Sequence, residues 1–237
     1  MPNYALVNKD FHQETRIKTE RSAELGDGVQ MAITFPAEFR NVQSDYPILF
    51  QKSGDDDYIP VALFGFEPNE NLFLNDDGWN ASYIPAMVRK EPFLIGSQGD
   101  GDDANRLLSL DLDHPRVNQE EGEALFGELG EMTDFLESRA AMLEMIYAGT
   151  QENKRLVQAL VDQDLIESVT FDITLNDGTR NSLLGFHTIN EEKLADLSAE
   201  TLHLFNRNDM LVSLFMIIAS TNKMQGLIDR KNARLNI

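Results

Sequence analysis

The sequence predicts an α+β fold in which an N-terminal antiparallel sheet, or meander, packs on a helical C-terminal half that also carries one β-hairpin. Three observations support this prediction. Short apolar runs separated by Gly, Asp and Asn fill residues 29–118, and apolar residues recur at helical spacing after Thr133. An Asp-Gly turn joins two alternating segments around Gly178. Short runs with polar turns are typical of antiparallel strands, whereas a spacing of three to four residues indicates amphipathic helices.

The first predicted strand covers residues 29–35, where larger apolar residues alternate with Gln, Ala and Thr until Pro36 ends the pattern. Gly65, within the apolar run ALFGF, indicates a bulge or the close approach of another backbone. The later apolar runs predict further short strands at residues 47–51, 59–66, 71–74, 83–88, 93–95 and 107–112. The segments between them are rich in Gly, Asp and Asn, the residues that hairpin connections favour.

The first predicted helix of the second half begins at Thr133, a typical N-cap residue, and ends at Gly149. Thr150 is then expected to cap a second helix. Because the connection would be so short, the two helices are expected to form an αα-hairpin.

The strongest hairpin signal lies at residues 176–179 (NDGT), between alternating segments at 169–175 and 180–188. After it, Asn190 and Ser198 are expected to begin two short helices. Asn208 is expected to cap a long final helix.

The expected organisation is a weakly structured N-terminal arm over residues 1–28, followed by one α+β domain over residues 29–237. That domain divides into a β-rich part at 29–118 and a helix-rich part at 119–237. The arm is polar, apart from a short apolar patch, and we expect it to dock on the body.

The net charge of −20 is spread over both halves of the chain and indicates which partners to expect. An acidic surface repels phosphate backbones, so we predict no nucleic-acid binding. The chain has no cysteine, which excludes disulfides and thiolate metal sites. We also expect no N-terminal secretory signal and no transmembrane segment, because the longest apolar run has ten residues. Synthesis in the cytoplasm is the expectation, with a cell-surface layer or a phage particle as candidate final locations.

Two groups of residues are candidate protein interfaces. Residues 69–95 contain Trp79, Tyr83, Arg89 and Lys90, a mixture of aromatic and cationic side chains that is enriched at interface hot spots. The alternative is that these aromatics fill the core and that Arg89 pairs with an internal carboxylate. The second group is a set of cations near the C-terminus, namely Arg230, Lys231 and Arg234. They are expected either to dock on an acidic neighbour or only to oppose the negative end of the last helix dipole.

The acidic loops are the candidate metal sites. Asp100, Asp102 and Asp103, and likewise Asp55 to Asp57, offer clustered oxygen ligands of the kind that calcium takes. We favour solvated loops without a bound cofactor, with calcium as the alternative. His12 and Glu14 have the H-x-E spacing of a non-haem iron site, which would need a second histidine from His114, His187 or His203.

The sequence resembles the SapC-like family of bacterial proteins, named from surface-layer gene clusters and with relatives in phage genomes. The resemblance runs from about residue 29 to 230. It lies in YPILF (46–50), PVALFGF (60–66), ENLFL (70–74), WNASYIPAMVRKEPF (79–93), GEALF (122–126), TDFLE (133–137), LVQALVDQDLI (156–166) and LLGFHTINEEKL (183–194). It implies association with a surface layer or particle and carries over no catalytic residue.

The function that we expect is therefore that of a non-enzymatic structural or assembly protein, working through protein partners or self-assembly. The alternatives are a metal-dependent or accessory enzyme of the non-haem iron type and a small-ligand binding module. No nucleophile or phosphate-loop motif occurs in the chain to favour an enzyme.

Overall fold

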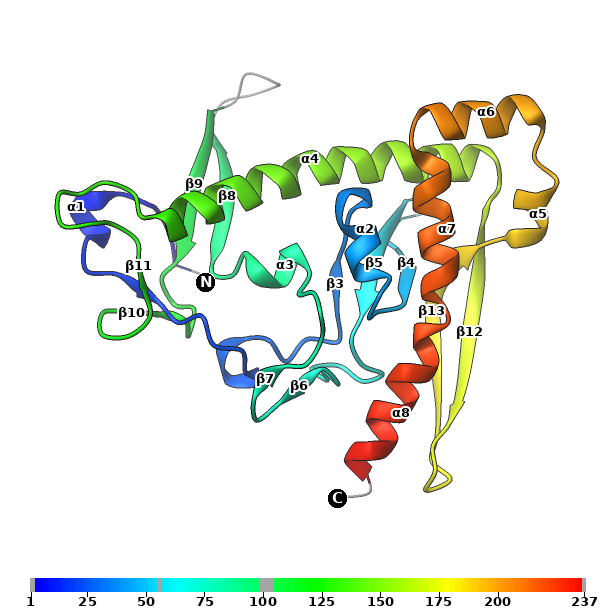
Figure 1. Cartoon of the computed structure of the whole chain (residues 1–237), viewed down its shortest axis with the longest axis horizontal. Coiled ribbons are helices and arrows are strands. Elements are labelled where there is room, and N and C mark those ends of the chain that lie inside the picture. The colour runs from blue at the N-terminus through cyan, green and yellow to red at the C-terminus, as the bar shows by residue number, and fades with distance from the viewer. Residues whose placement is uncertain (1–2, 55–56, 99–104, 236–237) are drawn as a thin grey trace.

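The computed structural model describes residues 3–54, 57–98 and 105–235, which combine helices with antiparallel sheets (Figure 1). Helices predominate after residue 133, and one long hairpin interrupts them. The predicted α+β class, with a helical C-terminal half, is confirmed.

The largest sheet has five antiparallel strands in the order β12-β13-β4-β5-β3. These strands are β3 (Met31–Ile33), β4 (Ile48–Lys52), β5 (Tyr58–Leu63), β12 (Ile166–Thr174) and β13 (Arg180–Ile189). The predicted hairpin is confirmed as β12 and β13, and its turn holds Gly178 at φ 85°. β13 pairs with β4 through Phe186 and His187, so the hairpin from the second half extends the N-terminal meander.

Both faces of this sheet are covered, because the consecutive residues Ile48, Leu49 and Phe50 of β4 are all fully buried. Helix α7 (Met210–Ser220) packs on β4 and β13, and α2 (Pro36–Val42) lies between α7 and α4 (Figure 1). At the end of α7 the Ser220 hydroxyl accepts a hydrogen bond from the Ile48 amide at 2.8 Å. This hydrogen bond therefore fixes the C-terminal end of α7 to the first residue of β4.

Helix α4 (Asp134–Asp162) runs unbroken along one side of the molecule (Figure 1), so the predicted αα-hairpin is wrong. Thr133 caps it as predicted, accepting from the Leu136 amide at 3.3 Å. Gly149 does not end the helix; it lets the helix pass over Phe35, whose Cγ would lie 2.6 Å from a β-carbon at that position. The Thr150 hydroxyl bonds inside the helix, donating to the Ile146 carbonyl at 3.0 Å.

Asn190 and Ser198 cap α5 (Glu191–Ala195) and α6 (Ala199–Arg207), as predicted. The prediction for Asn208 is wrong, because this residue ends α6 and donates to the Leu204 carbonyl at 2.8 Å. Asp209, at φ 57°, precedes α7. The final helix is also two helices, since α7 ends at Ser220 and α8 (Lys223–Leu235) follows a short turn.

Within the described residues, one helical stretch, Met210–Leu235, is long and apolar enough to cross a bilayer by length and composition. Core helices meet the same criterion. In α7 the side chains of Leu214 and Ile217 are fully buried in the core that the five-stranded sheet shares.

The N-terminal residues, expected to have little structure of their own, pair with distant segments. β1 (Tyr4–Leu6) joins β9 (Asn105–Asp111), which pairs with β8 (Phe93–Gln98). β2 (Arg16–Ile17) lies between β10 (Val117–Asn118) and β11 (Glu123–Ala124). The one-turn helix α1 (Lys9–His12) and the 3₁₀ turn η1 (Ala23–Leu25) complete the segment. Its two strands are ordered by pairing with residues far along the chain.

Residues 69–95 contain a small hairpin, β6 (Leu74–Asn75) with β7 (Gly78–Trp79), and the short helix α3 (Ala86–Arg89). Only the end of the predicted strand at 71–74 is a strand, and the strand predicted at 83–88 is wrong. Pro85 has no N–H for a ladder and instead precedes α3 at φ −56°. The close approach predicted at Gly65 is confirmed, since a β-carbon there would lie 2.5 Å from the Glu70 carbonyl oxygen.

Candidate functional site

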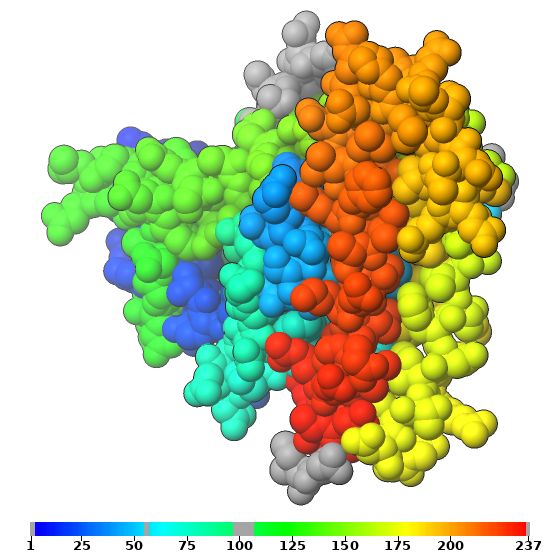
Figure 2. Space-filling view, turned by 45° about the vertical axis from the view of Figure 1, so that its right-hand side comes forward, coloured from blue at the N-terminus to red at the C-terminus, as the bar shows by residue number. Residues whose placement is uncertain are grey.

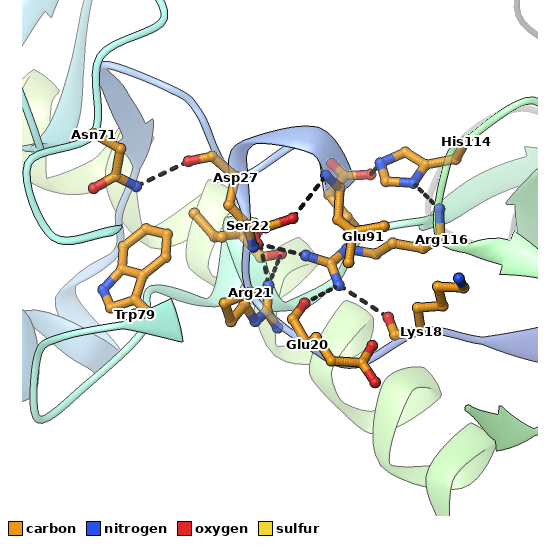
Figure 3. Close-up of polar contacts among 12 residues, drawn as sticks. Lys18, Glu20, Arg21, Ser22, Asp27, Asn71, Trp79, Glu91, His114 and Arg116 are labelled. Carbon is orange, nitrogen blue, oxygen red and sulfur yellow. Dashed lines mark hydrogen bonds and ion pairs between the residues drawn. The ribbon is translucent and has the colours of Figure 1, made fainter. Parts of the chain in front are cut away.

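Among the described residues, the most strongly buried ion pair joins Arg116 to Asp27 (Figure 3). Arg116 is 1% exposed, and its Nη2 donates to Asp27 Oδ2 at 2.6 Å. Its Nη1 donates to the Lys18 and Glu20 carbonyls at 2.9 and 2.7 Å. One guanidinium thus holds the N-terminal segment against the turn before β10.

Asp27 accepts further hydrogen bonds that join more of the chain to this pair (Figure 3). Oδ1 accepts from Arg21 Nη1 at 3.0 Å, and Oδ2 also accepts from the Ser22 amide at 3.0 Å. The Asp27 carbonyl accepts from the Asn71 side chain at 2.9 Å. The Asp27 side chain and carbonyl therefore join Arg21, Ser22, Asn71 and Arg116 at one point of the fold.

Two more arginines, Arg89 and Arg139, lie beside this ion pair. Arg21 Nη1 donates to the carbonyl of Val88 in α3 at 3.4 Å, and Arg89 is the next residue of that helix. Arg139 lies on α4, with its guanidinium 4.7 Å from the Phe135 ring centre. Burial lowers the pKa of Arg139, and the charges of Arg21, Arg89 and Arg116 lower it further. Burial is also the main cause that lowers the pKa of Arg21. We call Arg21, Arg89, Arg116 and Arg139 the arginine cluster.

The cluster carries buried donors without acceptors. Among the described residues, the Nε atoms of Arg89, Arg116 and Arg139 are buried and have no hydrogen-bond partner. A buried N–H without an acceptor costs about 1–3 kcal/mol. Arg89 and Arg139 are otherwise half-buried, so the cluster reaches the surface between α3 and α4.

The candidate interface residues Trp79 and Tyr83 lie in an internal hydrogen-bond chain. Trp79 Nε1 donates to the Tyr46 hydroxyl at 2.8 Å, and that hydroxyl donates to the Tyr83 carbonyl at 2.5 Å. The Tyr83 hydroxyl donates to Glu38 at 2.8 Å. Burial, followed by the charge of Glu38, raises the pKa of Tyr83 to about 12. Both aromatic side chains are half-buried.

The neighbouring cations are also engaged within the chain. Arg89 Nη2 donates to the Tyr83 hydroxyl at 2.9 Å, and its guanidinium lies 4.9 Å from the Tyr83 ring centre. Lys90 is buried and its Nζ donates to Glu91 at 2.7 Å. The carboxylate of Glu38 accepts hydrogen bonds from the Tyr83 hydroxyl and the Ala86 amide. Arg89 is linked to Glu38 through the Tyr83 hydroxyl.

The C-terminal cations dock on residues 67–80 of the same chain. Lys231 forms ion pairs with Glu67 at 3.0 Å and Glu70 at 2.5 Å. Arg230 donates to the Asn80 carbonyl at 3.1 Å and stacks on Phe73 at 4.3 Å. Arg234 donates to the carbonyls of Asn71 and Leu74 at 2.7 and 2.6 Å. The C-terminal cations therefore bind the start of the stretch 69–95 that also contains Trp79 and Tyr83, through Glu70, Asn71, Phe73, Leu74 and Asn80.

Comparison with known proteins gives one match: a model of the SapC family matches residues 7–227. The chain belongs to the SapC family. No curated protein and no solved structure matches it. The part shared with the SapC family includes the whole arginine cluster and Asp27, whereas Arg230, Lys231 and Arg234 lie beyond it.

Most residues of the candidate acidic metal sites lie outside the part of this SapC-family chain that the structure describes. Asp55, Asp56, Asp100, Asp102 and Asp103 lie outside the described residues. Within residues 3–54, 57–98 and 105–235, no three His, Asp or Glu side chains lie close enough to share a metal ion.

The histidines occupy four separate places in the SapC fold. His12 is buried and its Nδ1 contacts the Asn8 backbone at 3.0 to 3.1 Å, and His203 lies on the exposed side of α6. His187 packs edge-on against Tyr58 in the main sheet. His114 lies beside the ion pair, where its Nδ1 accepts from the Arg116 amide at 3.2 Å (Figure 3).

Two of the open hollows on the surface of this SapC protein exceed 500 Å³. One, of about 510 Å³, lies between α2, α4 and α7. The other, of about 520 Å³, lies near His114 and is lined by apolar side chains of β3, α3 and β8 with Tyr4, Glu91 and Asp111. Trp79 lines neither hollow, so a ligand site beside Trp79 stays a prediction.

Sequence reasoning missed Arg21, Asp27, Arg116 and Arg139 entirely. They come from three segments of the chain, around residues 21–27, 116 and 139, and each is a single charged residue without a recurring spacing. The excess of 40 acidic over 20 basic residues makes each cation notable, but it does not show which arginines meet.

Proposed function

We propose that this SapC-family protein is a non-enzymatic assembly protein that binds further copies of itself head to tail. A surface layer or a particle is the setting that its family resemblance implies. The observation that carries the proposal is a pair of complementary features on separate parts of the surface: an exposed apolar tip with acidic neighbours, and an open apolar groove with two arginines.

The tip consists of Phe11, Leu129 and Met132. Phe11 is 84% exposed and Leu129 is 93% exposed. The two segments touch, because Gln13 Nε2 donates to the Gly127 carbonyl at 2.7 Å. This region projects from the rest of the molecule in Figure 1, where α1 lies beside the loop that follows β11. Large apolar side chains at such exposure are typical of interaction sites.

The groove is the hollow between α2, α4 and α7. Its apolar lining consists of Pro36, Ala37, Leu156, Met210, Val212 and Met216. Figure 2 shows the face on which α2 lies against α7, with the segment before α4 projecting to one side. Val212 is 46% exposed on the rim, and Phe215, one helical turn further along α7, is 58% exposed.

Charge favours the tip as the occupant of this groove. Arg40 and Arg155 line it together with the carboxylates Glu152 and Asp209. Neither guanidinium has a hydrogen bond or ion pair within the described residues, so both can pair with carboxylates of a second copy. The tip carries the exposed carboxylates Glu128 and Glu131 beside Leu129. Pairing these groups across an interface would partly offset the repulsion between two copies of net charge −20.

A contact between two different patches is heterologous, so it generates open chains, or rings where the rotation between copies closes, and not a symmetric dimer. This geometry makes the proposal testable with two single-residue variants. Leu129→Asp removes the tip and keeps the groove, whereas Val212→Asp removes the groove and keeps the tip.

The measurement is sedimentation velocity over a range of protein concentrations. The unaltered chain is expected to form a ladder of oligomers, and each variant alone is expected to stay monomeric. Mixing the two variants should give a dimer that grows no further, because only one tip and one groove are intact in each pair.

Leu184→Asp is the matched control, since Leu184 is 69% exposed on β13, away from both patches. It should associate like the unaltered chain. A monomer at every concentration would refute self-assembly, as would a mixture of the two variants that stays monomeric while the control assembles.

A further inference from the structure

The arginine cluster has more positive than negative charge at its centre. Four guanidiniums face two buried carboxylates, Asp27 and Glu38. Glu38 is already bonded to the hydroxyls of Thr34 and Tyr83 and to the Ala86 amide. Glu123, exposed on β11, is the one further carboxylate whose charge acts on Arg139. The centre therefore keeps a surplus of positive charge inside a chain whose net charge is −20.

The spare donors point to the kind of ligand. Three buried Nε–H groups, on Arg89, Arg116 and Arg139, have no acceptor among the described residues. A guanidinium presents its donors in a flat fork that matches the oxygens of a phosphate or carboxylate. Within the described residues Arg139 forms no hydrogen bond, and its guanidinium stacks on the ring of Phe135.

The arginine cluster is partly exposed to solvent. Arg116 is sealed in, whereas Arg89 on α3 and Arg139 on α4 are half-buried, and α3 contacts α4. An ion that arrives between these helices would meet Arg139 and Arg89 first, with the charges of Arg21 and Arg116 behind them. Desolvated charges of this kind attract an anion more strongly than exposed ones.

From these contacts we propose that the arginine cluster is a binding site for a small dianion, of which inorganic phosphate is the simplest. A dianion would offset the surplus positive charge and accept from the Nε–H groups of Arg89 and Arg139. Arg139 is the main ligand, because its guanidinium has no acceptor of its own among the described residues. Arg89 is the second ligand, and Arg21 and Arg116 act through their charge and hold the site in shape.

The test is calorimetric titration of the full-length chain with sodium phosphate, with sodium chloride added to hold ionic strength constant. Phosphate is expected to bind at one site per chain and to raise the unfolding temperature, and chloride alone is expected to do neither. Arg139→Gln should weaken phosphate binding by about tenfold or more, the loss expected for one charge-assisted hydrogen bond. Arg139→Lys keeps the charge without the fork, so its affinity should fall between the two.

Arg155→Gln is the matched control, because Arg155 lies on the same helix, is exposed and is remote from the cluster. It should bind phosphate like the unaltered chain. A second readout separates binding from structure: without phosphate, Arg139→Gln should unfold at the same or a higher temperature, because it removes repulsion from three neighbouring cations.

Succinate, a dianion with two carboxylates, distinguishes the sources of the ligand chemistry. Binding of succinate alone would assign the site to dicarboxylates, and binding of phosphate alone would assign it to phosphate groups; both outcomes support a dianion site. The proposal is overturned if neither dianion binds, if chloride gives the same stabilisation, or if Arg139→Gln binds phosphate as tightly as the unaltered chain.

Discussion

Gly149 in the middle of α4 lies directly against the buried ring of Phe35, so that a β-carbon at Gly149 would come within 2.6 Å of Phe35 Cγ. Alanine normally stabilises a helix interior by about 0.5–1 kcal/mol relative to glycine. Here the added methyl group has to displace a fully buried ring. We expect Gly149→Ala to lower the free energy of unfolding by about 1–3 kcal/mol, the usual cost of overpacking, measured by urea denaturation.

Gly226 on α8 is the control for this prediction, because a β-carbon there meets nothing within 4 Å. Gly226→Ala should stabilise the protein by about 0.5–1 kcal/mol. Equal effects of the two substitutions would show that the contact with Phe35 is not what selects glycine at position 149.

Removal of the Asp27 charge is expected to be among the most destabilising single changes. Asp27→Asn leaves Arg116, which is 1% exposed, and Arg21 without their shared carboxylate. Breaking a buried pair by removing one partner costs about 3–5 kcal/mol. Asp164→Asn, which removes the exposed partner of Lys193, should change the free energy of unfolding by less than about 1 kcal/mol. A cost for Asp27→Asn as small as for Asp164→Asn would contradict this account.

The ion pair of Lys231 with Glu70 is expected to stabilise the docking of α8. Both side chains are 13% exposed, and Glu70 also accepts from the Phe66 amide at 2.9 Å. Burial lowers the pKa of Lys231, and its bonds to Glu70 and Glu67 outweigh this effect, so that its pKa lies above its ordinary value. Lys231→Met should cost about 1–3 kcal/mol at neutral pH.

For the same pair, the raised pKa fixes the sign of the pH dependence. The stabilisation from Lys231 is complete below its unfolded pKa and is lost as the pH rises through its folded pKa. A double-mutant cycle with Glu70→Gln should give a coupling energy that disappears in strong alkali. Lys223→Met, on the first turn of the same helix, serves as the control and should show no coupling to Glu70.

His114 is expected to make the protein less stable in mild acid. Burial lowers its pKa, the charges of Glu91 and Asp111 raise it, and those of Arg116 and Lys90 lower it; the net direction is downward. The unfolded chain then binds a proton that the folded chain refuses, so stability falls as the pH drops below the ordinary value for histidine, about 6.5. His187, whose pKa is also lowered by burial, contributes with the same sign.

His114→Asn isolates this effect, since an amide oxygen can replace Nδ1 as the acceptor for the Arg116 amide. Its unfolding free energy should vary less between pH 7.5 and 5 than that of the unaltered chain. An unchanged slope would mean that His114 does not contribute to the acid sensitivity.

Local patterns in the sequence were sufficient for elements whose signal is local. The turn at Gly178 and the caps Thr133, Asn190 and Ser198 are found as predicted. The alternating segments of the main sheet are strands, although the one predicted at 29–35 is a strand only over Met31–Ile33. Gly149 shows where local reasoning fails. Glycine is favoured both at a helix end and where another group comes close, and only the position of Phe35 decides between the two.

The candidate site was harder to predict, because it depends on contacts between distant segments. The cations at the C-terminus have their partners at residues 67–80, and Arg116 binds carbonyls at Lys18 and Glu20. In residues 83–88 the β-forming side chains favoured a strand, yet Pro85 starts a helix whose first amide is held by Glu38. Which carboxylate or carbonyl each of these charged side chains binds is determined by the tertiary fold and not by the local sequence.

The strand order of the main sheet also constrains how the protein can be synthesised. One edge of β4 has its partner in β13, so the ribosome must make everything from Ser53 to Thr179 before that edge can be covered. At roughly 5–20 residues per second this takes on the order of ten seconds. During that time the apolar strand Ile48–Lys52 is an unpaired edge on a nascent chain, open to neighbouring chains on the same messenger. Slow or crowded translation is therefore the condition under which this protein is most exposed to mispairing.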